Sequence, residues 1–418
     1  MNLIDTNSID ALPGDIPKEM TVIIINDYNT VVGGASSVAI QEFNNLKTNE
    51  NLEVIFLYAI KSENTNPEKT LIEGTNELKS KSYFQLITEG IVNRKIKVEL
   101  DLFLRNFDSK KTIVHIHSFV KAFSYGAFAV CHKLGFKICY TTHDYFLTCP
   151  NGAHYNFTKK NICKLKPGSL RCLTEKCDRR NSLQKIFRYI RFKKQSAALS
   201  NIPINIIGLS DLNIEVIQKN TGLKTSTYKL LNPISTIKQA RVAAELNGFI
   251  CGYVGHFSKE KGADVLSHAL DTLSIKSVFI GAGELQSTVE NGDSNRKVLG
   301  WMNHTSLYEK MKSFSCLVFP SRWYEGQPLV VLEALSMGIP VICSDSCAAK
   351  EFIIEGKNGF LFRSGDQVDL RKKIQMILDH GKLKEMSIYA YEYFWNNYPD
   401  NDKHTSDLIG IYQKVLGI

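Results

Sequence analysis

The sequence lacks any long hydrophobic run. No stretch reaches 18 uncharged apolar residues, so a transmembrane helix is not expected. The most apolar long segment, from Pro328 to Cys343, is interrupted by Glu333. The first twenty residues include acidic side chains and no apolar core of signal-peptide length, so a cytoplasmic protein is expected. Hydrophobic residues make up 44% and charged residues 22%, which excludes disorder as the main state. A chain of 418 residues predicts two or three domains.

The sequence also lacks the doubled C-x-x-C pattern of a zinc site, although it has ten cysteines. Cys251, Cys316 and Cys343 lie in apolar runs and are expected in the core. Four others cluster between residues 149 and 177, with gaps that match no metal pattern: Cys149, Cys163, Cys172 and Cys177. Reduced structural thiols are the favoured interpretation of this cluster, and a metal site is the alternative.

The net charge of +9 is not spread along the chain. Thirteen lysines and arginines and only two acidic residues lie between Thr158 and Gln195, a local charge of +11 that leaves −2 for all other residues. This basic segment, 158–195, lacks the interleaved aromatic residues of single-strand binding, so nucleic acid is not the expected partner.

The second half of the basic segment predicts an amphipathic helix over Leu183–Leu199, capped by Asn181 or Ser182. Its apolar residues alternate with lysines and arginines, a pattern suited to an anionic membrane surface. A solvated helix that only covers a sheet is the alternative interpretation.

Short apolar runs alternate with amphipathic segments, which predicts parallel sheets covered by helices. Strands are expected at Thr21–Ile25, Val54–Tyr58, Thr112–Ile116, Lys137–Thr141 and Ile204–Ile207, with a helix over Ser36–Leu46. A second series has strands at Phe249–Val254, Ser277–Ile280, Ser315–Phe319 and Pro340–Cys343, with helices at Ala263–Thr272, Pro328–Met337 and Val368–His380. Pro233 breaks regular structure between the two series, so we expect two α/β domains facing each other across a cleft.

The chemistry concentrates between Pro320 and Ala334, where Glu325 precedes a predicted helix and Glu333 lies inside it. Gly326 and Gln327 would present backbone N–H groups at the helix N-terminus, which is an anion site. Glu325 beside it suits sugar hydroxyls, and Glu333 suits a ribose diol. A surface Glu325 and a structural Glu333 are the plain alternative.

Two further turns follow predicted strands of the same domain. Gly255–Gly262 contains Lys261, which could reach a phosphate near a helix start, and Gly281-Ala282-Gly283 makes a close backbone turn. Ligands of open α/β sheets bind at such strand ends.

These segments resemble the retaining glycosyltransferases of family 4, which have the GT-B fold: an α/β fold of two Rossmann-like, doubly wound parallel-sheet domains facing across a cleft. The resemblance covers most of residues 20–395 and is specific from Gly255 onward. The Trp-Tyr-Glu-Gly form of the loop ending at Gly326 is similar to enzymes of bacterial capsule or O-antigen assembly. It implies an acceptor-binding domain at 1–232, with 1–19 a candidate disordered segment, a nucleotide-sugar-binding domain at 233–395, and a C-terminal helix at 396–418 that returns to the first domain.

The resemblance assigns roles residue by residue. Glu325 would bind the donor sugar, Lys261 would neutralise the diphosphate, and His143 would lie by the acceptor and the sugar. Glu333 would hold the ribose, and Gly33 and Gly34 would let the first domain close on the diphosphate. The remaining donor-binding residues would be His256, Gly281, Gly283, Gly326, Gln327, Pro328 and Leu329. The family has arginine where this chain has His256, so a fixed bidentate charge on the diphosphate is missing.

The implied reaction transfers a hexosyl or N-acetylhexosaminyl group with retention, without an obligatory metal or cofactor. The donor would be a nucleoside-diphosphate sugar, with UDP favoured over GDP, and the acceptor a saccharide, in particular a lipid-linked one. The only Asp-x-Asp, Asp400–Asp402, does not follow a strand and is a poor metal site. The basic segment would then hold the enzyme on the inner face of the cell membrane.

Three alternatives remain open from the sequence. The chain could be another GT-B enzyme, either a nucleotide-sugar epimerase or a phosphorylase, or a non-enzymatic basic module that binds membrane or nucleic acid. His117, which follows an apolar strand, is a further cleft candidate, with a structural histidine as the alternative.

Overall fold

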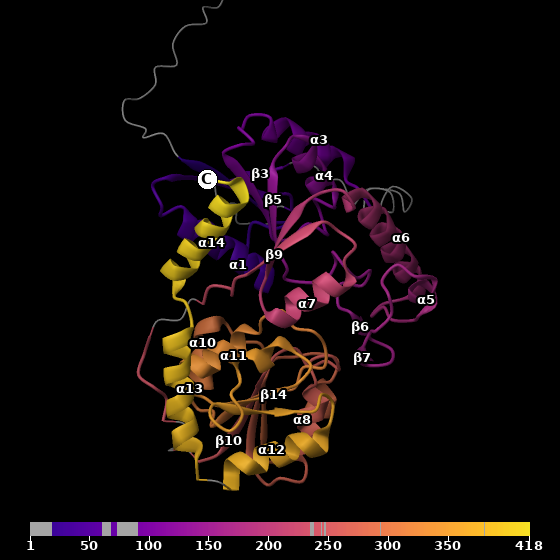
Figure 1. Cartoon of the computed structure of the whole chain (residues 1–418). Helices are drawn as coiled ribbons and strands as arrows, with labels where there is room; N and C mark the ends of the chain where they lie inside the picture. Colours follow the sequence, from indigo (N-terminus) through magenta and orange to yellow (C-terminus); the bar gives the residue numbers. More distant parts are fainter. Residues whose placement is uncertain are drawn as a thin grey trace, which may run out of the picture.

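The computed structural model (Figure 1) has two parallel β-sheets, each covered by helices, one above the other. The structure describes residues 19–60, 68–72, 91–234, 238–243, 245, 248–292, 294–379 and 381–418. The candidate disordered segment 1–19 therefore lies outside the described residues, apart from its last residue.

The first sheet has seven parallel strands in the order β3-β2-β1-β4-β5-β8-β9. Its strands are β1 Met20–Ile25, β2 Leu52–Tyr58, β3 Lys69–Leu71, β4 Thr112–Ile116, β5 Lys137–Thr141, β8 Ile204–Gly208 and β9 Thr225–Lys229. The central strand β1 pairs in register with both β2 and β4, so that Ile24 lies between Phe56 and His115. Strands β1 and β4 are almost wholly buried because helices cover both faces of the sheet.

Within the described residues, six longer helices belong to the first sheet: α1 Gly34–Leu46, α3 Arg94–Leu104, α4 Gly126–Lys133, α6 Ser182–Leu199, α7 Asp211–Asn220 and α14 Asn401–Leu416. Residues of α3 and α4 form the apolar core on one face, and α1 with the C-terminal α14 forms the core on the other. An excursion between β5 and α6 holds the antiparallel pair β6 Tyr155–Asn156 and β7 Asn161–Ile162 and the short α5 Leu170–Thr174.

The second sheet has six parallel strands in the order β12-β11-β10-β13-β14-β15. Its strands are β10 Ile250–Val254, β11 Lys276–Ile280, β12 Arg296–Leu299, β13 Cys316–Phe319, β14 Val341–Ser344 and β15 Gly359–Phe362. Its helices are α8 Ala263–Leu270, α9 Gln286–Glu290, α10 His304–Met311, α11 Leu329–Ser336, the 3₁₀ helix Ala348–Phe352, α12 Gln367–Asp379 and α13 Leu383–Asn397. The cores on its two faces contain α8 with α12 and α11 with α13.

The predicted strands and helices are confirmed, with ends that differ by at most two residues. The Asn181 side chain caps α6 as predicted, since its Oδ1 accepts from the backbone N–H of Gln184 at 2.9 Å. The sequence analysis did not predict the edge strands β3, β9, β12 and β15. β3, β9 and β12 are short and carry lysine, arginine, serine or threonine, so they lack the apolar run that marks a buried strand, and β15 has only four residues.

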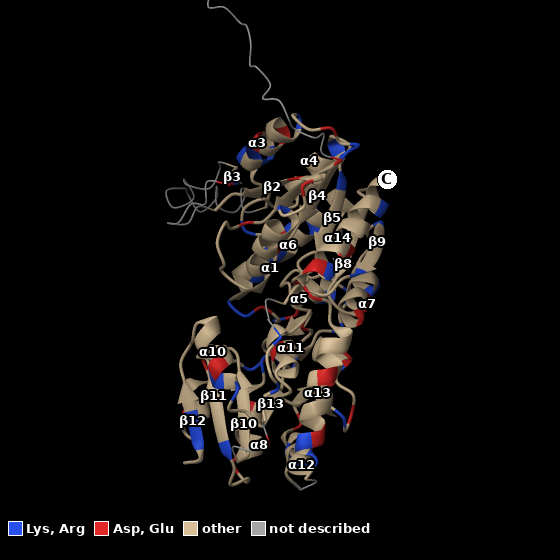
Figure 2. Cartoon of the chain, turned by 90° about the vertical axis from the view of Figure 1, so that its left-hand side faces the viewer, with Lys and Arg blue, Asp and Glu red and all other residues tan. Residues whose placement is uncertain are grey.

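Polar contacts join the units of the two sheets, and Figure 2 marks where lysine, arginine, aspartate and glutamate residues occur along the backbone of both units. The Glu351 carboxylate accepts from the backbone N–H groups of Asp211 and Leu212 at 3.0 and 2.8 Å, at the N-terminus of α7. Arg179, from the excursion before α6, lies 3.4 Å from Glu260 of the second unit. A carboxylate at a helix N-terminus is favourable because the helix dipole places partial positive charge there. The two units therefore meet through specific polar contacts.

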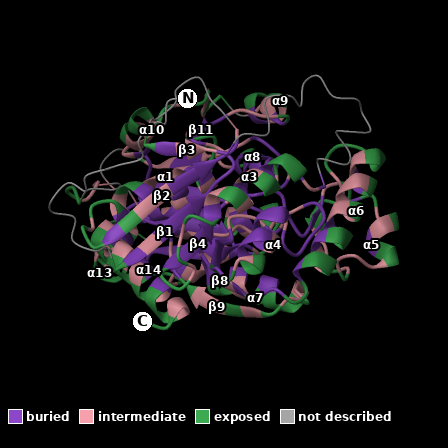
Figure 3. Cartoon of the chain, turned by 90° about the horizontal axis from the view of Figure 1, so that it is seen from above, coloured by how far each residue is buried: buried purple, intermediate pink, exposed green. Residues whose placement is uncertain are grey.

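No helix in the described part of the chain is long and apolar enough to cross a membrane. Most of the first sheet is buried, whereas α5 and α6 at the rim expose many residues (Figure 3).

Candidate active site

A cavity of about 610 Å³ lies between the two units, at the carboxyl ends of their parallel strands. The first unit contributes α1 and the loops after β5 and β8 to its lining, and the second unit contributes the loops after β10 and β13. Strand ends at a change of strand order are where open α/β sheets bind ligands. The volume lies in the usual range for a small-molecule site.

Nine residues predicted from the sequence line this cavity: Gly34, His143, His256, Lys261, Glu325, Gly326, Gln327, Pro328 and Leu329. The fold thus brings together residues that are up to 295 positions apart in the sequence. Other lining residues went unnoticed in the sequence, among them Tyr253, Leu209 and Trp301, which is 64% exposed. An exposed tryptophan beside a glycine-rich turn is the signal that could have revealed Trp301.

Four predicted donor-binding residues do not line the cavity. Gly281 and Gly283 are packing positions, because a Cβ there would overlap the carbonyl oxygens of Gly255 and Phe257. Gly33 lines a neighbouring cavity instead. Glu333 is buried, and its Oε1 lies 2.9 Å from His304 Nε2.

Histidine 304 had no predicted partner. The hydrogen bond that His304 donates to the Glu333 carboxylate raises the His304 pKa, and burial opposes this only in part. Glu333 is thus held by a histidine of α10, which sequence spacing does not predict.

Lys261 and Glu325 form an ion pair within the cavity, with Nζ 2.7 Å from Oε1. The Ser321 hydroxyl donates to the same Glu325 oxygen at 2.8 Å. The Lys261 ammonium also lies 5.0 Å from the centre of the Trp323 ring, a cation–π distance. Both side chains are largely buried, so their charges are held in a defined geometry.

Helix α11 begins at the cavity with an N-terminus that no side chain of the described residues caps. Leu329 and Val330 of its first turn line the cavity, so free N–H groups face it. Gln327 plays a different part: its Oε1 accepts from the Asn232 backbone N–H at 2.6 Å and so holds the segment between the two units. The uncapped helix start is an anion site.

Besides Lys261, two other basic residues, His256 and Lys259, belong to the loop after β10. His256 lines the cavity, and its Nδ1 is buried without a hydrogen-bond partner in the described structure. Lys259, which precedes Lys261 in the same loop, is paired with Asp264 at 2.9 Å. Lys261 and His256 are therefore the basic residues that face the cavity.

His143 is held from behind by a chain of buried polar side chains. Its Nε2 lies 2.9 Å from His117 Nδ1, and His117 Nε2 lies 3.1 Å from Glu42 Oε2. Burial and, to a smaller extent, the neighbouring His117 together lower the His143 pKa to about 3, although Glu42 opposes them, so His143 is neutral near pH 7. His117 is fully buried and outside the cavity lining, so it supports His143 rather than facing the cleft.

The C-terminal helix α14 completes this network. His404 Nε2 lies 3.3 Å from Glu42 Oε1, and the Tyr412 hydroxyl lies 2.6 Å from His115 Nδ1. Burial alone would raise the Glu42 pKa, but His117, with His404 and His115, outweighs it and holds the pKa well below its usual value. Glu42 is therefore charged.

Glu42, His115 and His117 are also the one group of potential metal ligands within the described residues whose ligand atoms lie within 4.8 Å of one another. His115 has both ring nitrogens engaged, with Tyr412 and with Thr141 at 2.7 Å. The group is therefore a hydrogen-bonded network.

The four cysteines of the 149–177 cluster form no such ligand group in the part of the chain that the structure describes. They are free thiols, and the buried Lys185 places its Nζ 2.9 Å from Cys177 Sγ and 3.9 Å from Cys172 Sγ. This geometry does not support the metal-site alternative.

A second cavity of about 390 Å³ adjoins the first and shares Gly34 and Ala35 with it. Its charged lining residues are Asp27, Lys121, Asp144, Arg180, Arg188 and Arg191. The Arg191 guanidinium lies 5.1 Å from the centre of the Phe146 ring, and Arg188 is paired with Asp178 at 3.0 Å. Burial raises the Asp144 pKa to about 6. The backbone N–H of Phe146 and the charge of Arg191 act in the opposite direction and lower this pKa, but burial outweighs them. His143 and Asp144, adjacent in sequence, thus line adjoining cavities.

The second unit matches a known family. Residues 235–393 match the model of the glycosyl transferases group 1. An uncharacterized glycosyltransferase, MJ1178, of Methanocaldococcus jannaschii is 30% identical over 138 residues, 32% of this chain and 39% of that protein. The capsular polysaccharide biosynthesis glycosyltransferase CapM of Staphylococcus aureus is 26% identical over 200 residues, 44% of this chain and 48% of that protein. The chain thus spans less than half the length of these two relatives.

Other matches cover almost the whole chain. An uncharacterized 41.2 kDa protein in the cps region of Klebsiella pneumoniae is 23% identical over 94% of this chain and 98% of its own length. Sucrose-phosphate synthase from Thermosynechococcus elongatus has a TM-score of 0.68 at 17% identity, over 95% of this chain and 99% of its own. Anabaena Alr3699/HepE, solved with UDP-glucose, has a TM-score of 0.65 at 13% identity, over 94% and 100%. The predicted GT-B arrangement of two parallel-sheet α/β domains is confirmed, and residues 235–393 form a glycosyl transferase group 1 domain within it.

Proposed function

We propose that the chain is a retaining glycosyltransferase that transfers a hexosyl or N-acetylhexosaminyl group from a nucleoside-diphosphate sugar to a saccharide acceptor in surface polysaccharide biosynthesis. The observation that carries the proposal is the pairing of Lys261 and Glu325 beside the uncapped N-terminus of α11. A diphosphate and a sugar need these two kinds of group, a cationic site and a carboxylate, next to each other. The division into domains at 1–232, 233–395 and 396–418 is part of this proposal.

In the proposed donor complex the diphosphate draws Lys261 away from Glu325, which becomes free to accept hydrogen bonds from the sugar. When the bond from the anomeric carbon to the phosphate oxygen breaks, negative charge grows on the departing diphosphate. Lys261, His256 and the N–H groups of α11 stabilise that charge more in the transition state than in the ground state. The acceptor oxygen forms its bond on the same face, and its proton passes to the departing phosphate oxygen.

The acceptor is proposed to enter the second cavity, next to the shared residues Gly34 and Ala35. Neutral His143 would lie between the two substrates as a hydrogen-bond partner. Asp144 and Asp27 offer carboxylates for acceptor hydroxyls, and Arg191, which has no ion pair within the described residues, offers a positive charge. This lining suits a saccharide that carries an anionic group, such as a lipid-linked saccharide with its phosphate.

A UDP-sugar is the favoured donor. HepE, which shares the fold, has been solved with UDP-glucose, and this supports UDP over GDP only at the level of the fold. No obligatory metal or cofactor is proposed. O-antigen and capsule assembly are the proposed pathways, in keeping with the relative CapM.

The proposed location is the inner face of the cell membrane, held by the basic segment 158–195. Helix α6 carries most of that segment's second half, and three of its large apolar residues are exposed: Leu183, Ile186 and Ile190. Lysine and arginine next to exposed apolar residues favour an anionic membrane surface.

A thermal-shift panel of UDP-, GDP-, ADP- and dTDP-sugars tests the donor site, since a ligand that binds only the folded chain raises its apparent stability. A rise in melting temperature with one nucleotide class is expected. Product analysis with a labelled donor then separates the proposal from its alternatives: transfer gives a labelled saccharide, whereas an epimerase returns a labelled nucleotide sugar. The absence of stabilisation by all four donors would contradict the proposal.

A further inference from the structure

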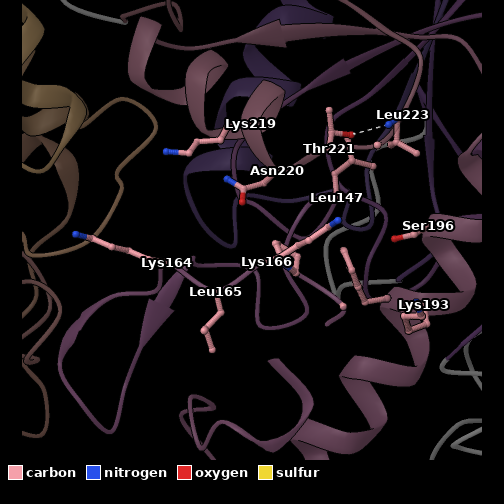
Figure 4. Close-up of a pocket in the computed structure, with 14 residues that line it drawn as sticks. Leu147, Lys164, Leu165, Lys166, Lys193, Ser196, Lys219, Asn220, Thr221 and Leu223 are labelled. Carbon is pink, nitrogen blue, oxygen red and sulfur yellow. Dashed lines mark hydrogen bonds between the residues drawn. The ribbon is translucent and has the colours of Figure 1, made fainter. Parts of the chain in front are cut away.

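A lysine-lined pocket of about 580 Å³ lies on the flank of the first domain, apart from both cavities of the active site (Figure 4). It is formed by the loop 164–168, by α6, and by the end of α7 with the turn that follows it. None of its lining residues lines the donor or the acceptor cavity. The reaction proposed above does not use it.

The pocket is positively charged and has no counter-charge. Four lysines line it, namely Lys164, Lys166, Lys193 and Lys219, and no aspartate or glutamate does. Within the described structure none of the four makes an ion pair. Like charges facing one space repel each other, and a bound anion relieves that repulsion.

Neutral polar groups add to the lining. Asn220 lies between Lys219 and Lys166 in Figure 4, and Ser196 lies across the pocket from them. The Thr221 hydroxyl accepts from the Leu223 backbone N–H at 3.2 Å, which holds the turn after α7 in place. The lining therefore combines ammonium groups with hydroxyl and amide groups, a set suited to phosphate oxygens.

An exposed apolar stripe on α6 leads into this pocket. Leu183, Ile186 and Ile190 are 69%, 46% and 42% exposed and recur at helical spacing. Lys193, three residues after Ile190, continues the same helix face and lines the pocket. Leu199 of α6 is buried against the domain, and the buried Phe192 forms part of the pocket wall beside Lys193. The stripe therefore points to solvent at the outer edge of the domain (Figure 3).

We propose that this pocket binds the phosphate of an anionic phospholipid headgroup while the α6 stripe enters the apolar layer beside it. The proposal rests on the membrane attachment proposed above and gives it a specific site. A soluble phosphate compound would need the lysines but not the stripe. A membrane lipid presents both a phosphate and an apolar layer, the two kinds of group that the lysines and the α6 stripe are suited to contact.

The test uses the full chain and vesicles of phosphatidylcholine with or without phosphatidylglycerol, read by flotation. Wild type is expected to bind only the vesicles with phosphatidylglycerol. The double variant Lys166→Gln with Lys193→Gln is expected to lose about tenfold or more in affinity. The matched control, Lys95→Gln with Lys97→Gln on α3, removes the same charge from another surface and is expected to bind like wild type. Melting temperatures check that all variants are folded.

Equal losses in the two double variants would overturn the pocket, since general charge attraction would then explain binding. If wild type binds no vesicle, the headgroup site and the membrane attachment both fail. Glycosyl transfer is unaffected by that outcome, because the donor panel is read without vesicles. In a final experiment, inorganic phosphate is added to the vesicle assay. If millimolar phosphate prevents vesicle binding, the pocket binds free phosphate, and the proposal of a lipid headgroup is wrong.

Discussion

Lys261 Nζ lies 2.7 Å from Glu325 Oε1, so the two charged residues proposed to bind the donor form an ion pair with each other. They come from the loops after β10 and β13, 64 residues apart. The pair satisfies a partly buried carboxylate and a partly buried ammonium until a substrate competes for them. A diphosphate would compete with Glu325 for the lysine, and sugar hydroxyls would compete with Lys261 for the glutamate.

Replacing either member of this pair should stop transfer without unfolding the chain. Lys261→Ala removes charge opposite the departing diphosphate, and Glu325→Ala removes the proposed sugar contact. We expect kcat/KM to fall by at least about 100-fold in each variant. Steady-state kinetics measures this, and circular dichroism reports folding.

Lys276→Ala on the exposed start of β11 is the matched control for a lost lysine, and it should retain wild-type kinetics. Near-normal turnover in either site variant would remove the pair from the donor site.

Acid should destabilise the fold partly through His143. Its pKa in the folded chain is about 3, and an unfolded histidine has a pKa near 6.5. Below about pH 6.5 the unfolded chain therefore binds the extra proton, so stability present at neutral pH is lost as the pH falls towards 3. Between pH 7 and pH 4.5 the unfolding free energy of wild type decreases. We expect this decrease to be about 2 kcal/mol smaller in His143→Asn than in wild type.

Chemical denaturation at a series of pH values measures this difference. His132→Asn replaces an exposed histidine of α4 and should leave the pH dependence as in wild type. The assignment fails if both variants have the wild-type slope.

Acceptor binding should depend on pH through Asp144, whose pKa is raised to about 6. Above pH 6 the carboxylate is charged and accepts hydrogen bonds from the acceptor, whereas below pH 6 it is protonated. We expect the acceptor KM to rise as the pH falls through 6, and Asp144→Asn to have a raised KM with no such dependence. Arg191→Gln should raise the acceptor KM about tenfold if the acceptor carries an anion.

Donor KM is the internal control for these variants, since neither side chain lines the donor cavity. An equal rise in donor and acceptor KM would contradict an acceptor role for the second cavity.

Gly283→Ala should destabilise the chain rather than weaken donor binding selectively. A Cβ at Gly283 would overlap the backbone of Phe257, and relief requires the loop after β10 to shift. We expect a loss of roughly 2 kcal/mol or more in unfolding free energy, measured by denaturant titration.

Gly300→Ala makes the matched comparison, because a Cβ at Gly300 meets nothing within 4 Å. Its stability should match wild type. A stable Gly283→Ala with a raised donor KM would contradict this packing role and support the predicted donor-binding role of Gly283.

Local sequence patterns were sufficient to predict the strands and helices of the two α/β domains, because the periodicity of a strand or helix and the glycines of a turn can be recognised within a few residues. They also indicated the cavity loops, since Lys261 and Glu325 each follow a strand in the same domain. Strand carboxyl ends of a parallel sheet meet at one edge, so this part of the site follows from the order of elements.

Only the tertiary structure decided which side chains satisfy one another across the chain. His404 and Tyr412 of α14 reach Glu42 and His115 across sequence separations of 362 and 297 residues, and no spacing rule encodes such contacts. Glu333, predicted to hold the ribose, accepts a hydrogen bond from His304 that sequence spacing did not indicate. The charge of the basic segment was evident from the sequence. The packing of α6 decided where this charge lies. Arginines of the segment line the cavity at the cleft, and lysines line the pocket on the flank, because one helix presents different faces to different neighbours.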